Sequence, residues 1–250
     1  MPTPHDPASA DAATSPPARV AVVGDGRMGR AIAAGLRTAG VSVSGPLGRG
    51  ASGAGADAVL LAVPDAAIEA AAAHIAPGRI VGHLSGATTL APLAGHRAFS
   101  LHPLMTVTAD GARFDGVPAA VAGSDAAALG VARDLAAILG MRPFEVADAD
   151  RAAYHAAAAV ASNFLITLEG LAERLAASAG VGREALVPLV RASVENWARR
   201  GARDALTGPV ARGDEAVVAA HRAAVAQRAP DALALFDALV TATRQLGATA

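Results

Sequence analysis

A short apolar run followed by three spaced glycines constrains this chain more than any other feature. Residues 20–23 are Val-Ala-Val-Val, and a Gly-x-Gly-x-x-Gly turn follows at once, before a helical pattern begins. In a dinucleotide-binding turn the first glycine permits the tight bend, the second admits a pyrophosphate, and the third lets helix and strand pack closely. The helix N-terminus offers free N–H groups to the phosphates. An ordinary tight turn in a glycine-rich chain is the alternative. We predict that the cofactor-binding residues here are Gly24, Asp25, Gly26, Arg27, Met28 and Gly29.

Strand and helix patterns alternate over residues 18–148. Helices are expected over 27–39, 66–75 and 125–139, between strands over 19–23, 41–44, 58–63, 80–84, 96–101, 117–122 and 141–146. This alternation predicts an α/β fold with a doubly wound, mostly parallel sheet of the Rossmann type. Ligands of such sheets bind beyond the carboxyl ends of the strands. We therefore expect Val63 and Pro64 to lie against the cofactor.

Residues 149–250 contain only helical patterns and predict a second, all-helical domain. A long helix is expected from Asp148 or Asp150 to about Ala179, and another over 183–200 with a kink at Pro188. Residues 206–214 are too rich in turn-forming residues to be helical. Residues 1–17 lack periodicity and a signal pattern, so we predict a disordered tail and a cytoplasmic protein.

Composition excludes several classes of chemistry. The chain has 250 residues, a net charge of −1, no cysteine and 21 basic residues that are all arginine. Thiolate and lysine nucleophiles are therefore absent, and the charge gives no reason to expect nucleic-acid binding. The histidines show no zinc-type spacing. No uninterrupted apolar stretch is long enough to span a membrane, so we expect no membrane contact.

The end of the second predicted strand bears on the choice of cofactor. In NAD-binding proteins an acid about 20 residues beyond the glycines binds the ribose 2′-hydroxyl. Here that position is Ser44, no acid occurs over residues 41–56, and Arg49 follows in a glycine-rich loop. A hydroxyl and a guanidinium suit a 2′-phosphate. We predict NADP(H) rather than NAD(H), although a solvated loop arginine is the alternative for Arg49.

Four polar residues are candidates for catalysis. His102, at the end of a strand and before Pro103, is placed to exchange a proton during hydride transfer. His155 and Asn163 are spaced to share one face of the long helix, with Ala159 and Ser162. Ser85 begins a loop, continuing to Thr88, whose hydroxyls and N–H groups suit a carboxylate or phosphate. His83 is expected to face the core, and a structural role is the alternative for each of the others.

Six segments together resemble a family of Rossmann-like proteins whose C-terminal domain has no known function. They are residues 24–29, 62–65, 83–87, 100–104, 154–163 and 206–214. The chain is more distantly similar to pyrroline-5-carboxylate reductases, β-hydroxyacid dehydrogenases and deazaflavin-dependent NADP oxidoreductases. The resemblance implies a nicotinamide cofactor, a C-terminal domain like that of 6-phosphogluconate dehydrogenase, and a homodimer formed through it.

The resemblance also implies roles for particular residues. Ser85 and Asn163 match substrate-binding positions of β-hydroxyacid dehydrogenases, but Ala159 stands where their catalytic lysine would be. His102-Pro103 is similar to the His-Pro of prephenate dehydrogenases, which makes His102 the preferred acid or base, with His155 second. Apart from the resemblance, Arg212 in the turn-rich segment is a candidate partner for an anionic substrate, with a structural role as the more frequent alternative.

The sequence therefore predicts an NADP(H)-dependent oxidoreductase that acts on the carbonyl or imine of a small, anionic substrate. A non-catalytic dinucleotide-binding or regulatory protein is the alternative. A partner enzyme for a deazaflavin cofactor is the third possibility.

Overall fold

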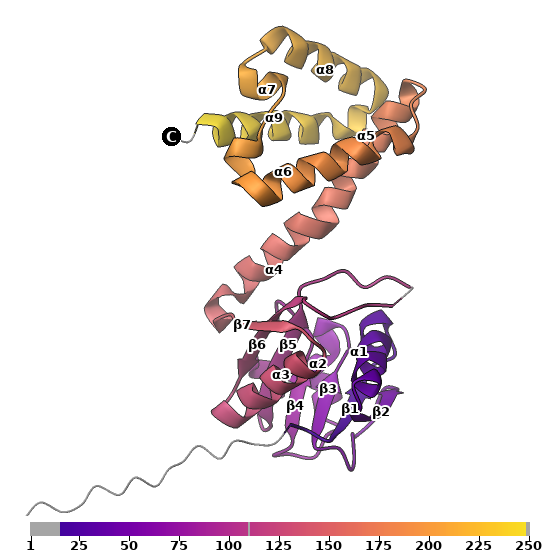
Figure 1. The fold of residues 1–250 in the computed structure, drawn as a ribbon, viewed down its shortest axis with the longest axis vertical. Coiled ribbons are helices and arrows are strands. Elements are labelled where there is room, and N and C mark those ends of the chain that lie inside the picture. Colours follow the sequence, from indigo (N-terminus) through magenta and orange to yellow (C-terminus); the bar gives the residue numbers. More distant parts are fainter. Residues whose placement is uncertain (1–15, 110, 249–250) are drawn as a thin grey trace, which may run out of the picture. The chain divides into compact units, whose positions relative to one another are not determined.

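The structure is a computed structural model and describes residues 16–109 and 111–248. Contacts within the chain divide it into two compact units, which meet in the sequence between Val160 and Ala161 (Figure 1). Each unit is described by itself. Most of the tail predicted over residues 1–17 lies outside the described residues.

The first unit contains a seven-stranded sheet with the order β2-β1-β3-β4-β5-β6-β7. All neighbouring strands are parallel except β5 and β6, so the sheet is mostly parallel as predicted. The second strand extends three residues beyond its expected end at Ser44. The strands are β1 (Arg19–Val23), β2 (Ser42–Leu47), β3 (Ala58–Leu61), β4 (Ile80–His83), β5 (Arg97–Pro103), β6 (Pro118–Gly123) and β7 (Arg142–Glu145).

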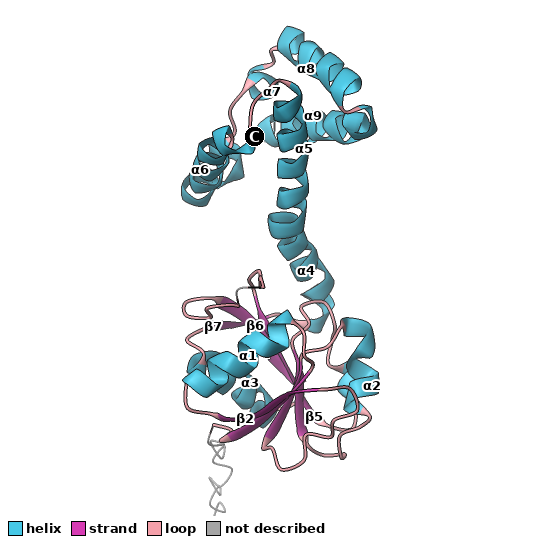
Figure 2. Ribbon diagram, turned by 90° about the vertical axis from the view of Figure 1, so that its right-hand side faces the viewer, coloured by secondary structure: helices cyan, strands magenta, loops and turns pink. Residues whose placement is uncertain are grey.

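Helices cover both faces of this sheet (Figure 2). On one face, α1 (Arg27–Thr38) and α3 (Ala126–Ile138) share a core with alternate strand residues such as Val20 and Val22. On the other face, the short α2 (Ile68–Ala72) packs with Ala21 and Val23. Because successive residues of β1 enter opposite cores, the strand is apolar throughout, as expected for a parallel strand buried on both faces.

The last helix of the first unit is α4 (Arg151–Ala159), and it follows a 3-10 turn at Asp148–Asp150. A π-helical turn at Val160–Phe164 then separates α4 from α5 (Leu165–Ser178). The single long α-helix expected from the sequence is therefore interrupted. Because a π-turn contains more residues than an α-turn, the angular spacing of side chains counted across it differs from that of a continuous α-helix.

The second unit consists of helices and the turns between them. Its further helices are α6 (Val187–Ala205), α7 (Pro209–Arg212), α8 (Glu215–Arg228) and α9 (Leu233–Ala248). Two local predictions were wrong. Pro188 lies in the first turn of α6, where a proline N–H would be unsatisfied in any case, so it begins the helix without kinking it. Part of the segment over 206–214 forms α7, and a proline is the first residue of this helix.

One helical stretch among the described residues bears on the expectation of no membrane contact, which stays a prediction. Asp148–Ser178 is 31 residues long with a mean hydropathy of 1.2 in its most apolar window, enough in length and composition to span a membrane. The sequence prediction considered only uninterrupted apolar runs, whereas an average tolerates the polar residues of this stretch. A single helix of this kind is weak evidence for a membrane segment.

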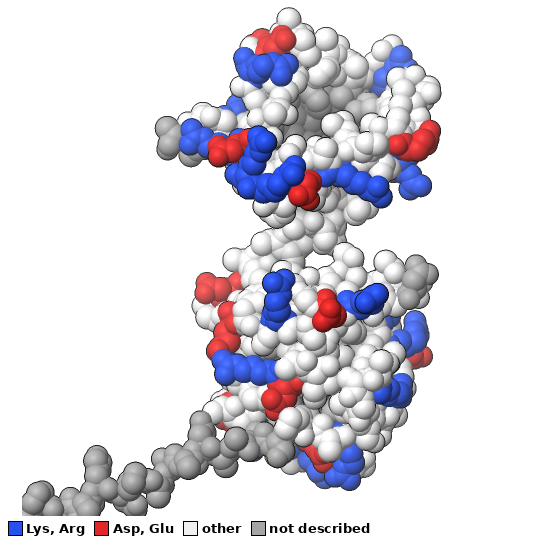
Figure 3. All heavy atoms as spheres, viewed as in Figure 1, with Lys and Arg blue, Asp and Glu red and all other residues white. Residues whose placement is uncertain are grey.

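The surface carries charges of both signs. Figure 3 shows arginine side chains interspersed with acidic side chains over the visible face of each unit.

Candidate functional site

The glycine turn joins β1 to α1 and has three different steric environments. Gly24 has φ +119°, and a Cβ atom there would lie 2.2 Å from the carbonyl oxygen of Ala62. A Cβ atom on Gly29 would lie 2.0 Å from the carbonyl oxygen of Gly24. Gly26 has φ −78°, and no atom lies within 4 Å of its Cβ position. The fold thus requires glycine at 24 and 29 but leaves open space beside Gly26, where a phosphate group would fit.

The other residues of the turn lie at the beginning of α1. Arg27 is the first residue of α1, whose first-turn N–H groups have no carbonyl partner within the helix. Met28 is partly buried and packs against the core between α1 and the sheet. Asp25 is exposed and forms an ion pair of 3.1 Å with Arg30 of the same turn. Neither carboxylate nor guanidinium of that pair is desolvated, so the pair contributes little to stability.

Of the two residues predicted to select the cofactor, one lies in β2 and the other just beyond it. The N–H of Gly24 donates to the carbonyl of Leu47 at 2.8 Å, which brings this strand end beside the glycine turn. Arg49 follows two residues later, exposed and without a side-chain partner among the described residues. Ser44 lies inside the strand, opposite Ala21, because β2 continues past its predicted end. The geometry therefore favours Arg49 over Ser44 as a contact for a 2′-phosphate.

His102, on β5, contacts a residue that sequence reasoning did not single out. Its Nδ1 lies 2.8 Å from the hydroxyl oxygen of Tyr154, and the two rings are perpendicular. The ring of His155 lies 5.9 Å from that of His102, centre to centre. A Cβ on Gly86 would be 2.8 Å from both His102 and His155, so glycine is needed for this approach. The structure thus brings His102, His155 and the loop after β4 together, with Tyr154.

Burial controls the protonation of this group. Burial, the largest cause, acts with the neighbouring His155 and Arg151 to lower the pKa of His102 to about 4, against the raising effect of Asp65. Burial also raises the pKa of Tyr154, while Arg151 lowers it. At neutral pH, therefore, the imidazole is uncharged and the phenol keeps its proton.

The hydroxyl of Ser85 already forms hydrogen bonds as a donor and as an acceptor within the protein. It donates to Oδ2 of Asp65 at 2.7 Å and accepts from the N–H groups of Ala87 and Thr88 at 3.2 and 2.9 Å. The hydroxyl of Thr88 donates to the same Asp65 oxygen at 3.0 Å. A substrate contact by Ser85 stays a prediction, and it would require one of these bonds to break. The N–H groups expected to bind an anion are already occupied at Ala87 and Thr88.

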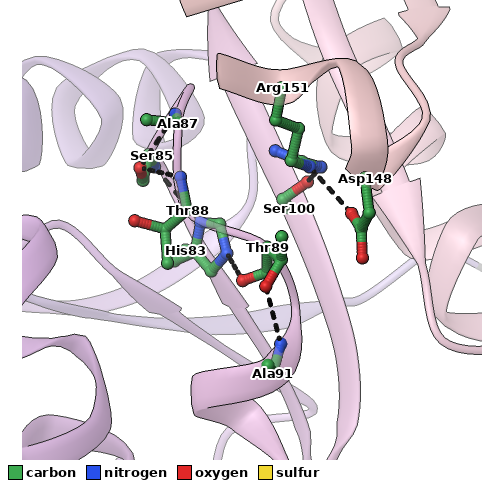
Figure 4. A network of polar contacts seen from close by, with 9 residues as sticks. All are labelled: His83, Ser85, Ala87, Thr88, Thr89, Ala91, Ser100, Asp148 and Arg151. Atoms are coloured by element: carbon green, nitrogen blue, oxygen red, sulfur yellow. Dashed lines mark hydrogen bonds and ion pairs between the residues drawn. The ribbon is translucent and has the colours of Figure 1, made fainter.

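His83 is buried, as expected from its place within a strand. Its Nδ1 accepts from the N–H of Ser85 at 3.2 Å, so its Nε2 carries the proton and donates to the carbonyl of Thr89 at 3.0 Å (Figure 4). Burial lowers its pKa. This neutral histidine braces the loop between Ser85 and Thr89 and has no ring nitrogen left for a substrate.

The remaining candidates are spread over other parts of the chain. Val63 and Pro64 lie in the short segment of chain between the end of β3 and Asp65. Asn163 belongs to the second unit, in the π-helical turn, where its Oδ1 accepts from the hydroxyl of Ser162 at 2.9 Å. The shared helix face predicted for His155 and Asn163 spans this π-helical turn and stays a prediction. Arg212 ends α7, also in the second unit.

Tyr154, Asp65 and Arg151 were not predicted as functional residues. Tyr154 is the only tyrosine of the chain and precedes His155, and Asp65 follows a buried strand. These were signals that the sequence offered. Among residues 16–109 and 111–248, no group of three or more histidine, aspartate or glutamate side chains could hold a metal ion.

Known structures with this fold cover nearly the whole chain. A Bacteroides fragilis protein, provisionally assigned as an NADP oxidoreductase, has 18% identity and a TM-score of 0.80, over 91% of this chain and 98% of its own. An imine reductase from Streptomyces aurantiacus has 17% identity and a TM-score of 0.65, with 91% and 93% covered. A 1-pyrroline-5-carboxylate reductase from Streptococcus pyogenes has 14% identity and a TM-score of 0.58, with 91% and 98% covered. These likenesses show the fold.

The sequence itself matches one family model. No curated protein matches the chain. Residues 117–243, slightly more than half of the chain, match the domain of unknown function DUF2520. This range begins just before β6 and ends within α9. The chain therefore belongs to the DUF2520 family, and it has the fold of the solved structures above, with a Rossmann-type first unit and a helical second unit.

Proposed function

We propose that this protein is an NADP(H)-dependent oxidoreductase that transfers a hydride to or from a small substrate with a carbonyl or imine group. The observation that carries the proposal is the open space beside Gly26. The fold itself explains why residues 24 and 29 are glycine, but a side chain at residue 26 would meet no protein atom. A bound phosphate that needs this space, next to the free N–H groups of α1, accounts for the lack of a side chain at residue 26.

Arg49 supports the phosphorylated cofactor. It lies beyond the end of β2, is exposed, and no acid accompanies it over residues 41–56. When the cofactor binds, its nicotinamide supplies the hydride chemistry. The chain's own residues bind the phosphates, shape the loop after β4 and hold the reacting proton.

The test compares binding of NADPH and NADH by calorimetry. We expect Gly26→Ala to weaken both by about tenfold or more, equal to about 1.4 kcal/mol, without changing the melting temperature appreciably. Arg49→Ala should weaken NADPH by about 10- to 100-fold, from a lost charge-assisted contact of about 1.5–3 kcal/mol, and leave NADH unchanged.

Two matched variants serve as controls. Gly170→Ala adds a methyl group in the second unit, where again nothing lies within 4 Å. Arg79→Ala removes an exposed arginine just before β4, at the amino end of the strand and so at the opposite edge of the sheet. Neither should affect binding. If Gly26→Ala binds both nucleotides as the parent does, the glycine turn is not the cofactor site.

We assign the proton transfer to His102 and Tyr154. Because its pKa is about 4, His102 is uncharged at neutral pH and cannot act there as an imidazolium acid. The phenol of Tyr154 is protonated and 2.8 Å away. In this scheme His102 donates its Nε2 proton to the substrate's oxygen or nitrogen while its Nδ1 takes the proton of Tyr154, and solvent then reprotonates the phenolate.

Asp65 favours an imine over a carbonyl. One carboxylate oxygen accepts from Ser85 and Thr88, and the other has no partner among the described residues. A carboxylate stabilises a protonated, cationic iminium but not a neutral carbonyl. The predicted anionic group of the substrate finds no support in this loop. It would have to bind elsewhere, and Arg212 keeps the role proposed for it only as a prediction.

A non-catalytic nucleotide sensor remains the second candidate, because Ala159 replaces the lysine that related dehydrogenases use. Turnover separates the two functions. A reductase oxidises NADPH when at least one imine or keto substrate is added. A sensor binds NADPH but does not oxidise it with any of these substrates.

We also propose a homodimer formed through the second unit. Among its described residues, the only buried hydrophobic side chains are Val218, Val225, Ala229 and Ala232. Large apolar side chains are instead exposed, including Ile166, Leu189 and Trp197 at 70%, 65% and 57%. Exposed apolar surface of this extent is typical of an interface, and a second copy of the chain would cover it, as the resemblance to dimeric dehydrogenases implies.

A further inference from the structure

Arg151 is the largest of the fully buried side chains, with 1% of its surface exposed. Its Nε donates to Oδ1 of Asp148 at 3.0 Å, and its Nη2 donates to the hydroxyl of Ser100 (Figure 4). Its Nη1 is buried without a hydrogen-bond partner among the described residues. Desolvating a cation costs several kcal/mol, and apolar replacements of buried ion pairs are often neutral or stabilising. Stability alone therefore does not explain an arginine here.

The position of Arg151 links the two elements that carry the proton-transfer pair. Ser100 and His102 are two residues apart on β5, so they lie on one face of the strand. Arg151 and Tyr154 are three residues apart on α4, so they lie on one face of the helix. The contacts Arg151–Ser100 and Tyr154–His102 are thus successive links between the same helix and strand.

The groups around His102 come from three elements. Arg151, Tyr154 and His155 belong to α4, His83 belongs to β4, and Asp65 belongs to the turn after β3. Arg151 is the permanent cation of this group, and Asp65 and the partly exposed Asp148 are the acids. A variant that keeps a positive charge at residue 151 therefore separates the effect of position from the effect of charge.

We propose that Arg151 is a positioning residue, whose forked guanidinium holds α4 against β5 so that the hydroxyl of Tyr154 meets Nδ1 of His102. Its meaning for catalysis rests on the proposed reductase function. The contact itself can be tested without a substrate, so a failure of this inference is distinguishable from a failure of that function.

The test uses Arg151→Lys and Ser100→Ala. Both keep the cation, and each removes one arm of the bridge, because an ammonium cannot reproduce the planar fork. Tyr154 is the only tyrosine, so phenolate absorbance reports its titration alone, and ring NMR reports that of His102. In both variants we expect the pKa of Tyr154 to fall toward 10.0 and that of His102 to rise from about 4 toward 6.5, because water reaches both groups.

Arg97→Lys is the control. Arg97 lies on the same strand and makes two hydrogen bonds of 3.0 Å to Asp125, but it is exposed. The Arg97→Lys variant should leave the titrations of both Tyr154 and His102 unchanged. Parent-like titrations in folded Arg151→Lys and Ser100→Ala proteins would overturn the inference, and so would equal shifts in the control. NADPH binding, measured on the same samples, tests the cofactor site independently.

Discussion

The pKa of His102 lies well below that of a free histidine, and the consequence is a dependence of stability on pH. The unfolded chain binds a proton at this residue near pH 6.5, whereas the folded protein resists protonation down to about pH 4. Stability is therefore fully present above pH 6.5 and is lost as the pH falls toward 4. The pKa of His83 is lowered too and acts in the same direction.

We expect the free energy of unfolding to fall by on the order of 3 kcal/mol across this window from His102. Urea denaturation at pH 7 and pH 4.5 measures it, and His102→Gln should show a smaller difference than the parent. The ion-paired carboxylate of Asp125, with a pKa of about 2, titrates below this window. An identical difference in His102→Gln would mean that the imidazole is not desolvated.

Asp65 gives a second prediction for a single residue. Asp65→Asn keeps an oxygen that can accept from Ser85 and Thr88 but removes the negative charge. We expect kcat/KM for a cyclic imine to fall about tenfold or more, equal to about 1.4 kcal/mol, with a smaller loss for a ketone. Asp57→Asn, at the other end of β3, is the matched control. Equal losses for imine and ketone would remove the argument for an iminium.

Single residues also show where sequence reasoning ends. The three glycines were assigned from a motif, and the close contacts at Gly24 and Gly29 give them a steric reason. The partners of His102 were not predictable, because Tyr154 is 52 residues away and only the packing of α4 on β5 joins them. Arg151 was missed for the same reason, since a buried arginine has no local signature in an alanine-rich helix.

Among the elements, α3 offers a clean test of what starts a helix. Asp125 accepts from the N–H of Ala128 at 2.8 Å as the N-cap and also pairs with the exposed Arg97. We expect Asp125→Ala to cost about 1 kcal/mol in chemical denaturation. Asp125→Asn keeps a capping oxygen and loses only the exposed ion pair, so it should cost much less. A similar cost for both would assign the stability to the ion pair.

The order of the elements was predictable because the apolar strands are buried on both sides and turn residues separate them. The seven strands and α1 and α3 lie where the patterns placed them. The interruption at Val160–Phe164 was not predictable, because its sequence Val-Ala-Ser-Asn-Phe contains no proline or glycine to mark a break in the helix. Asn163 lies in that turn, and its role stays a prediction.

At the scale of the whole molecule, the proposed dimer gives a prediction about the second unit. Leu189→Glu and Trp197→Glu place a charge on exposed apolar positions of α6. We expect both to shift sedimentation toward the monomer, while Val217→Glu on α8, a less exposed apolar position, should not. A parent protein that sediments as a monomer at all concentrations would contradict the dimer.

The thin core of the second unit has a practical consequence if a second copy of the chain completes it. The stability of such a unit is then a property of the solution as well as of the chain, since subunit association follows mass action. Each tenfold dilution should lower the apparent unfolding free energy by about 1.4 kcal/mol per mole of dimer. The melting temperature should therefore rise with protein concentration, and an enzyme assay at high dilution should underestimate specific activity.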